Sequence, residues 1–229
     1  MVRKIWFMIA VMPLSLVAGF FPATVHSSIA SVNGNEATLT KAFPVNGMSG
    51  VVMHSLGKGR EAISAIAVQT APGKIKITKG DLLEEASLPT PKSIASAGDK
   101  VIGGYLYGNV LVIAPNAETY SKIVRGTSKN WIHPDLFATF LAREGDSVPT
   151  PDNLADFAKE AQVGLVMVVK RGKAILYDPI SRRVVAEKSF QAIGGKNRYP
   201  FYMRFTKLEG GLFSGSSEGD YYRAVEAIR

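Results

Sequence analysis

The strongest constraint on the fold is a change of hydrophobic pattern near residue 107. Before it, short apolar segments are separated by glycines, and "GKIKITKG" places Ile75 and Ile77 on one face of a strand and lysines on the other. After it, "NVLVIAPN" is a continuous apolar run, which is typical of a strand buried on both faces. Segments with helical spacing follow this run. The two patterns predict two structural parts in one α+β chain.

Residues 28–107 predict a β-rich module. The dipeptide Asn33-Gly34 permits positive φ at both central positions of a turn, so we expect a hairpin between strands 29–32 and 36–39. Further short strands recur at regular spacing in "NGMSGVVMHSL", "EAISAIAVQTA" and "AGDKVIGGYLYGN". This spacing favours a small barrel or a curled sheet.

Residues 108–229 predict an αβ module with about three helices packed on a small sheet, and a short C-terminal helix. The helical segments are "AETYSKIVRG", "HPDLFATFLARE" and "TPDNLADFAKEAQ". The second has one apolar stripe, formed by Leu136, Phe137, Phe140 and Leu141. Three strands are expected in "VGLVMVVKRGKAILYDPISRRVVAEKSF".

Residues 1–19 predict a signal peptide. Arg3 and Lys4 precede the apolar run "IWFMIAVMPLSLVAGFF", and Val17 and Gly19 suit the positions three and one before a cleavage site. The alternative is an uncleaved anchor, but the run is shorter than the ~20 residues that span a bilayer. We therefore expect an exported protein without a membrane span after cleavage, in the periplasm or associated with the cell surface or outer membrane.

Cysteine usage and charge exclude several classes of function. The chain has no cysteine, which excludes disulfides, thiolate metal sites, a cysteine nucleophile and a lipidated N-terminal cysteine. Its net charge is +8, but the basic residues are scattered and no nucleic-acid-binding motif accompanies them. Nucleic acid is therefore not an expected partner. A basic surface outside the cytoplasm suits anionic envelope components or acidic proteins, and the alternative, which we prefer, is that the charge only aids solubility.

The segment "NWIHPDLF" contains the only histidine with suggestive neighbours. His133 precedes Asp135 by two residues, but the chain has no G-x-S-x-G elbow, no zinc or calcium spacing and no phosphate loop. We expect no catalytic residue, no metal and no cofactor. An exported hydrolase is the alternative, and it requires His133, a carboxylate and a hydroxyl to converge in a cleft.

The same segment has the features of a helix start. Pro134 suits the first helical position and Asp135 suits the positive end of the helix dipole. Trp131, together with Ile132, is expected to pack against the new helix as a staple. Trp131, His133, Pro134 and Asp135 are thus predicted to form a structural motif. The sequence identifies no partner-binding residues.

Several segments together resemble a known family. "LPTPK", "AGDKV", "YGNVLVIAPNAETY", "WIHPDLFATFL", "TPDNLADFAKEAQVGLVMVV" and "PFYMRF" run in order between Ser28 and Phe205. In this pattern the chain resembles the N-terminal domain of the bacterial plasminogen-binding proteins. The resemblance implies a secreted or surface-associated protein that is not an enzyme and whose partner is plasminogen. Kringle modules of plasminogen hold a lysine ammonium against carboxylates and a free carboxylate against a cation.

This sequence differs from the family in the segment to which plasminogen binding is attributed. In the family, binding is attributed to a lysine-rich tail that ends in lysine, whereas this sequence stops at Arg229 and its last lysine is Lys207. Arginine is not an equivalent ligand, because its planar guanidinium differs from a compact ammonium. A second resemblance, to small β-barrel modules of envelope ring assemblies, implies a periplasmic structural component of flagellar or secretion machinery.

Overall fold

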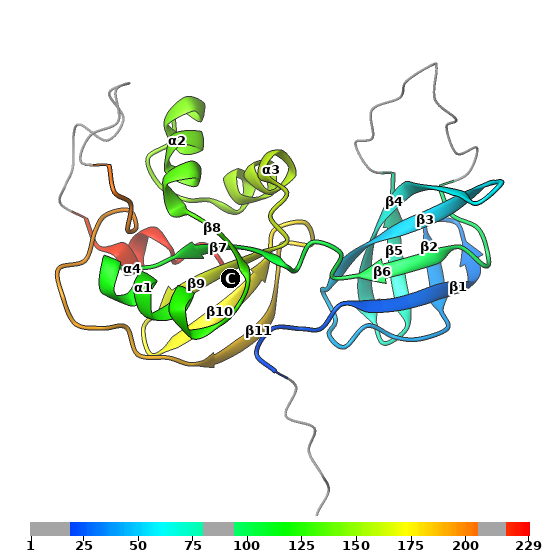
Figure 1. Cartoon of the computed structure of the whole chain (residues 1–229), viewed down its shortest axis with the longest axis horizontal. Coiled ribbons are helices and arrows are strands. Elements are labelled where there is room, and N and C mark those ends of the chain that lie inside the picture. The colour runs from blue at the N-terminus through cyan, green and yellow to red at the C-terminus, as the bar shows by residue number, and fades with distance from the viewer. Residues whose placement is uncertain (1–18, 80–93, 206–218) are drawn as a thin grey trace, which may run out of the picture.

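The computed structural model describes residues 19–79, 94–205 and 219–229. Residues 1–18, which hold nearly all of the predicted signal peptide, lie outside the described part. A closed barrel of six strands occupies one end of the molecule, and a five-stranded sheet with helices occupies the other (Figure 1). The α+β class predicted from the sequence is confirmed.

The barrel resolves the choice between a barrel and a curled sheet. Its strands are antiparallel and follow the order β1-β2-β5-β4-β3-β6, and pairing of β6 with β1 closes it. Ile75 and Ile77 point into the barrel core and are almost fully buried, as the alternation in "GKIKITKG" predicts. The strands are β1 Val25–Asn33, β2 Glu36–Leu39, β3 Ser49–Gly57, β4 Arg60–Ala71, β5 Lys74–Thr78 and β6 Lys100–Gly103.

The first hairpin is present, but its turn lies one residue later than predicted. Asn33 pairs with Glu36, so the two central residues are Gly34 and Asn35. Of these two residues, only Gly34 has a positive φ, at 61°. A glycine at the first central position is the pattern of a type II′ turn, whose twist matches that of the flanking strands.

The second sheet has a parallel centre and an antiparallel edge. Its order is β11-β10-β9-β7-β8, with β7 parallel to both β8 and β9. The strands are β7 Asn109–Ile113, β8 Asn130–Ile132, β9 Leu165–Lys170, β10 Lys173–Asp178 and β11 Arg183–Ser189. The helices are α1 Ala117–Gly126, α2 Pro134–Glu144, α3 Pro151–Ala161 and α4 Tyr221–Ala224. The short strand β8 was not predicted.

Both faces of this sheet are covered. Val110 and Val112 of β7 belong to a hydrophobic cluster that includes Ile123 of α1 and the interior of the barrel. Leu111 and Ile113 belong to a second cluster, with α2, α3 and α4. The apolar run in β7 is therefore buried on both sides, as the sequence predicts.

The predicted apolar stripe of α2 is wrong at one position. Phe137, Phe140 and Leu141 are buried, whereas Leu136 is 56% exposed. The spacing i, i+3, i+4 places the first three on one face, and residue 136 lies about 100° away from residue 137 around the helix.

A buried carboxylate joins the barrel to the sheet. Asp178, at the end of β10, is fully buried. One of its oxygens accepts hydrogen bonds from the Ser49 amide (2.9 Å) and the Tyr107 hydroxyl (2.7 Å). The other accepts from the amides of Ile180 and Ser181. Burial, followed by the charge of Asp178, raises the pKa of Tyr107 far above its usual value, so this phenol remains a hydrogen-bond donor.

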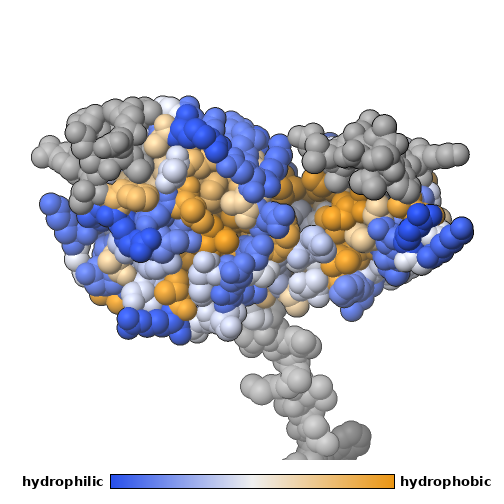
Figure 2. Space-filling view, turned by 45° about the horizontal axis from the view of Figure 1, so that its top comes forward, coloured by the Kyte–Doolittle hydropathy of each residue, from blue (hydrophilic) through white to orange (hydrophobic). Residues whose placement is uncertain are grey.

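The described surface carries hydrophobic residues in several separate areas. The face in Figure 2 shows them on both the barrel and the sheet, between hydrophilic residues. The large hydrophobic side chains with the highest exposure are Val32, Ile94, Tyr105, Leu136, Ile193 and Phe205. They come from different parts of the described chain.

Candidate partner-binding site at the carboxyl edge of the sheet

The carboxyl ends of β7, β8 and β9 lie at the same edge of the sheet, because these strands are parallel. Figure 1 shows this edge directed away from the barrel. The chain leaves β7 toward β8 on one side and later enters β9 on the other. Open αβ sheets bind ligands at such a switch point, in the crevice outside the carboxyl ends.

In this protein the C-terminal segments fill that crevice. Tyr221 is fully buried, and its hydroxyl lies 2.9 Å from the carbonyl oxygen of Ile113 in β7 and 2.7 Å from that of Val169 in β9. Burial raises the pKa of Tyr221 well above its usual value, which keeps the hydroxyl neutral. The amide of Tyr202 donates to the carbonyl of Ala114 at 2.8 Å. Two surfaces flank the filled crevice.

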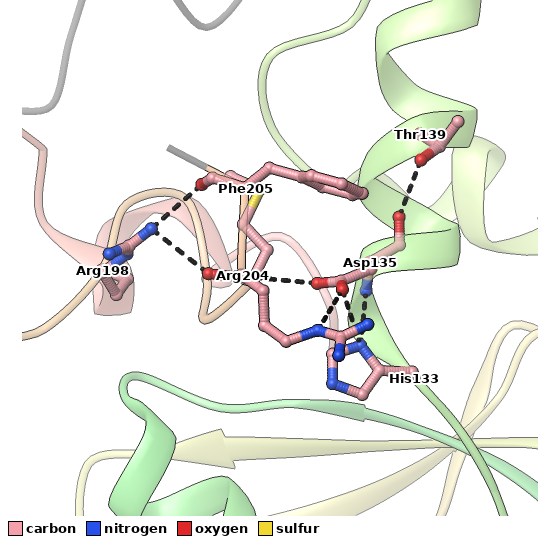
Figure 3. A network of polar contacts seen from close by, with 7 residues as sticks. His133, Asp135, Thr139, Arg198, Arg204 and Phe205 are labelled. Carbon is pink, nitrogen blue, oxygen red and sulfur yellow. Dashed lines mark hydrogen bonds and ion pairs between the residues drawn. The ribbon is translucent and has the colours of Figure 1, made fainter. Parts of the chain in front are cut away.

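The first surface is the helix-start cluster, which consists of His133, Asp135 and Arg204. His133 is the N-cap of α2, and its Nδ1 accepts a hydrogen bond from the Asp135 amide at 3.1 Å. The Asp135 carboxylate accepts from the Arg204 amide (2.8 Å) and from Arg204 Nε (2.6 Å). Figure 3 shows Arg204 and His133 both directed toward this carboxylate. Arg198 donates to the carbonyls of Met203 and Phe205, which holds the segment that carries Arg204.

Electrostatics explain how the cluster is held together. Burial alone would raise the pKa of Asp135. The hydrogen bonds donated by Arg204, followed by the electrostatic effect of the nearby His133, lower this pKa overall. Burial also lowers the pKa of His133, with a contribution from Arg204, while Asp135 opposes this shift. A neutral His133 is the form that accepts the Asp135 amide through Nδ1.

This arrangement does not favour a hydrolase. The Asp135 carboxylate is engaged by Arg204, and His133 Nδ1 caps α2. Within residues 19–79, 94–205 and 219–229, no serine or threonine hydroxyl is hydrogen-bonded to His133. The cluster docks the C-terminal segment onto the first turn of α2.

Trp131 does not join this cluster. Its indole nitrogen donates to the Thr127 carbonyl at 3.0 Å, and its ring contacts Phe21, with 6.2 Å between ring centroids. Ile132 packs instead against the cluster that contains α2. The prediction that Trp131 packs against α2 together with Ile132 is therefore wrong, because consecutive side chains of a strand point to opposite faces.

The pH dependence of thermal stability tests the capping role of His133. Because folding lowers the His133 pKa, its stabilising contribution is complete above the unfolded value of about 6.5 and is lost as the pH falls below it. His133→Asn keeps an N-cap acceptor that does not titrate. We expect the loss of thermal stability between about pH 7 and about pH 5 to be smaller in this variant. An identical pH dependence in both proteins would contradict this account.

The second surface is the basic pocket, a hollow of about 570 Å³ at the end of β9 and the start of β10. Residues from the C-terminal segment form its other wall. It is lined by Lys170, Arg171, Lys173, Asp220, Tyr222, Arg223 and Glu226. Four of these side chains are cationic and two are carboxylates, so the pocket can contact groups of either charge.

The cations of the basic pocket differ in how they are held. Arg171 pairs with Asp220 at 2.9 Å and lies 4.3 Å from the centre of the Tyr222 ring. Lys173 pairs with Glu187 at 2.9 Å. Lys170 forms no ion pair within the described residues, and its Nζ lies 3.4 Å from the Glu226 main-chain oxygen. Burial first, and then Lys173, lowers the pKa of Lys170.

Sequence reasoning could not find either surface in full. Asp135 and Arg204 are 69 residues apart, and the two walls of the basic pocket come from segments about 50 residues apart. Only the helix-start pattern around Pro134 gave a local signal. Among the described residues, no group of three or more His, Asp or Glu could hold a metal ion. No helix in the same part of the chain is long and apolar enough to cross a membrane.

Comparison with known proteins identifies the family of this chain. The family described as "Plasminogen-binding protein pgbA N-terminal" matches residues 24–227. Plasminogen-binding protein PgbA of Helicobacter pylori strain J99 is 28% identical over 169 residues, which cover 71% of this chain and 37% of that relative. The PgbA of strain 26695 gives the same identity and coverage. The chain thus spans about 37% of the length of these curated relatives. No solved structure matches it significantly. The chain belongs to the family of plasminogen-binding protein PgbA N-terminal domains.

Proposed function

We propose that this chain is an exported, non-enzymatic binding protein of the bacterial cell envelope, and that plasminogen is its partner. The observation that carries the proposal is the family match over residues 24–227, whose relatives are named plasminogen-binding proteins. The predicted signal peptide at residues 1–19 supports export. We also propose residues 28–107 and 108–229 as its two modules. The comparisons do not favour the alternative of a ring-assembly component.

The lysine-rich tail to which the family's binding is attributed lies beyond the domain matched by residues 24–227, so we assign the contact that this domain makes with plasminogen to the basic pocket. A lysine-binding kringle holds an ammonium against carboxylates and a carboxylate against a cation. The basic pocket presents both groups within one hollow, because Lys170 and Lys173 lie beside Glu226 and Asp220. Lys170 makes no ion pair among the described residues, so no internal salt bridge must break before its ammonium is bound.

Binding of plasminogen by purified variants tests this assignment. We expect the purified protein to bind immobilised plasminogen and the lysine analogue ε-aminocaproate to compete. The double variant Lys170→Gln, Lys173→Gln should weaken binding about tenfold or more, since each charge-assisted contact contributes more than 1 kcal/mol. Lys159→Gln on α3 is the matched control, because that lysine is 58% exposed and lies outside the pocket.

Three results would count against the proposal. They are an absence of binding, binding that ignores the lysine analogue, and equal binding by the double variant and the original protein. The last result would leave plasminogen as the partner and reject the basic pocket as the contact surface.

A further inference from the structure

A second hollow lies between the barrel and the sheet, far from the carboxyl edge. This interdomain cleft has a volume of about 500 Å³. Asn46 and Lys76 stand on its barrel wall, and Ser181 and Arg183 stand on the wall formed by the turn between β10 and β11 and the start of β11. Pockets for small molecules are commonly found at such junctions and have volumes of about 300–1,000 Å³.

The charged groups of the cleft are all cationic. Lys76 and Arg183 line it, and no aspartate or glutamate does. Glu36 is the cross-strand neighbour of Lys76, but neither cation forms an ion pair within the described residues. The side-chain carbonyl of Asn46 already accepts a hydrogen bond from Gln69 at 3.2 Å. The NH₂ of the Asn46 side-chain amide therefore remains available to donate a hydrogen bond to a ligand.

Ser181 supplies the most specific indication of a ligand. Its Oγ is buried and has no hydrogen-bond partner among the described residues. Its main-chain amide is held by the Asp178 carboxylate at 3.0 Å, which fixes the residue in place. An unsatisfied buried hydroxyl costs free energy and calls for an explanation, such as a bound molecule.

We propose that the interdomain cleft binds a small molecule that carries an oxyanion, either a carboxylate or a phosphate. Lys76 and Arg183 neutralise the charge, and Asn46 donates a hydrogen bond. The Ser181 hydroxyl donates a second one after its side chain rotates toward the cleft, since no hydrogen bond holds it in its buried position. Because the donors come from both the barrel and the sheet, the ligand links these two parts next to the Asp178 junction. Binding should therefore also raise the unfolding temperature of the whole protein.

Calorimetric titration with inorganic phosphate and with citrate tests the proposal and separates the two kinds of oxyanion. We expect saturable binding of at least one probe. Arg183→Gln and Lys76→Gln should each weaken it about tenfold, and Ser181→Ala should weaken it several-fold. Lys159→Gln, on α3 and outside both hollows, is the control and should leave it unchanged.

Ser181→Ala separates a ligand contact from a structural role. Since the Oγ has no partner, the unfolding temperature of the free variant should equal or exceed that of the original protein. The rise in unfolding temperature caused by the probe should shrink in this variant. Failure of both probes to saturate at millimolar concentration would overturn the proposal. Equal binding by the original protein, Ser181→Ala and Arg183→Gln would do the same.

Discussion

Asp178→Ala is expected to lower the free energy of unfolding by about 3–5 kcal/mol, because it leaves several buried donors without an acceptor. The carboxylate is fully buried and receives hydrogen bonds from Ser49, Tyr107, Ile180 and Ser181. Two of these donors lie on the barrel side and two on the turn that follows β10. Urea denaturation followed by tryptophan fluorescence measures the loss.

Two further variants isolate the role of this carboxylate. Asp178→Asn keeps one acceptor oxygen and should lose less stability than the alanine variant. Asp156→Ala, on α3, removes a side chain that is 65% exposed and should change stability by less than about 0.5 kcal/mol. If Asp178→Ala costs no more than Asp156→Ala, Asp178 does not hold the junction.

Phe137→Ala is expected to cost about 3–5 kcal/mol, since it removes a fully buried aromatic ring from the core under α2. The Phe137 ring packs against Phe157 and Phe201, with centroid distances of 5.1 Å and 5.6 Å. Leu136→Ala changes the adjacent residue, which is 56% exposed, and should cost less than about 1 kcal/mol. Thermal unfolding of both variants measures the difference. Similar losses in the two variants would show that the helix face has been assigned wrongly.

The sequence predicted those parts of the fold that depend on local periodicity. Alternation at Ile75 and Ile77 and the apolar run of β7 indicate burial on one face and on two faces, and the structure confirms both. The prediction that Leu136 is buried was wrong, because composition marks a residue as apolar, whereas its angle around the helix decides whether it is buried. Closure of the barrel was left open, because pairing of β1 with β6 joins segments about 75 residues apart.

The candidate site was less predictable for the same physical reason. Pro134 and Asp135 carry the local preferences of a helix start. The partner of Asp135 is Arg204, however, and no periodic pattern connects positions so distant in the sequence. Tyr221 fills the crevice between β7 and β9 from the last eleven residues of the described chain. Long-range contacts of this kind follow from topology, which a local pattern does not specify.

The most direct test of the proposed function is a nuclear magnetic resonance titration of the isotope-labelled protein with an isolated lysine-binding kringle module. The assignment of the contact to the basic pocket predicts chemical-shift changes at the residues that line it, which are Lys170, Arg171, Lys173, Asp220, Tyr222, Arg223 and Glu226. Addition of ε-aminocaproate should reverse these changes. Changes confined to the barrel, or an unchanged spectrum, would contradict the assignment of plasminogen binding to this surface.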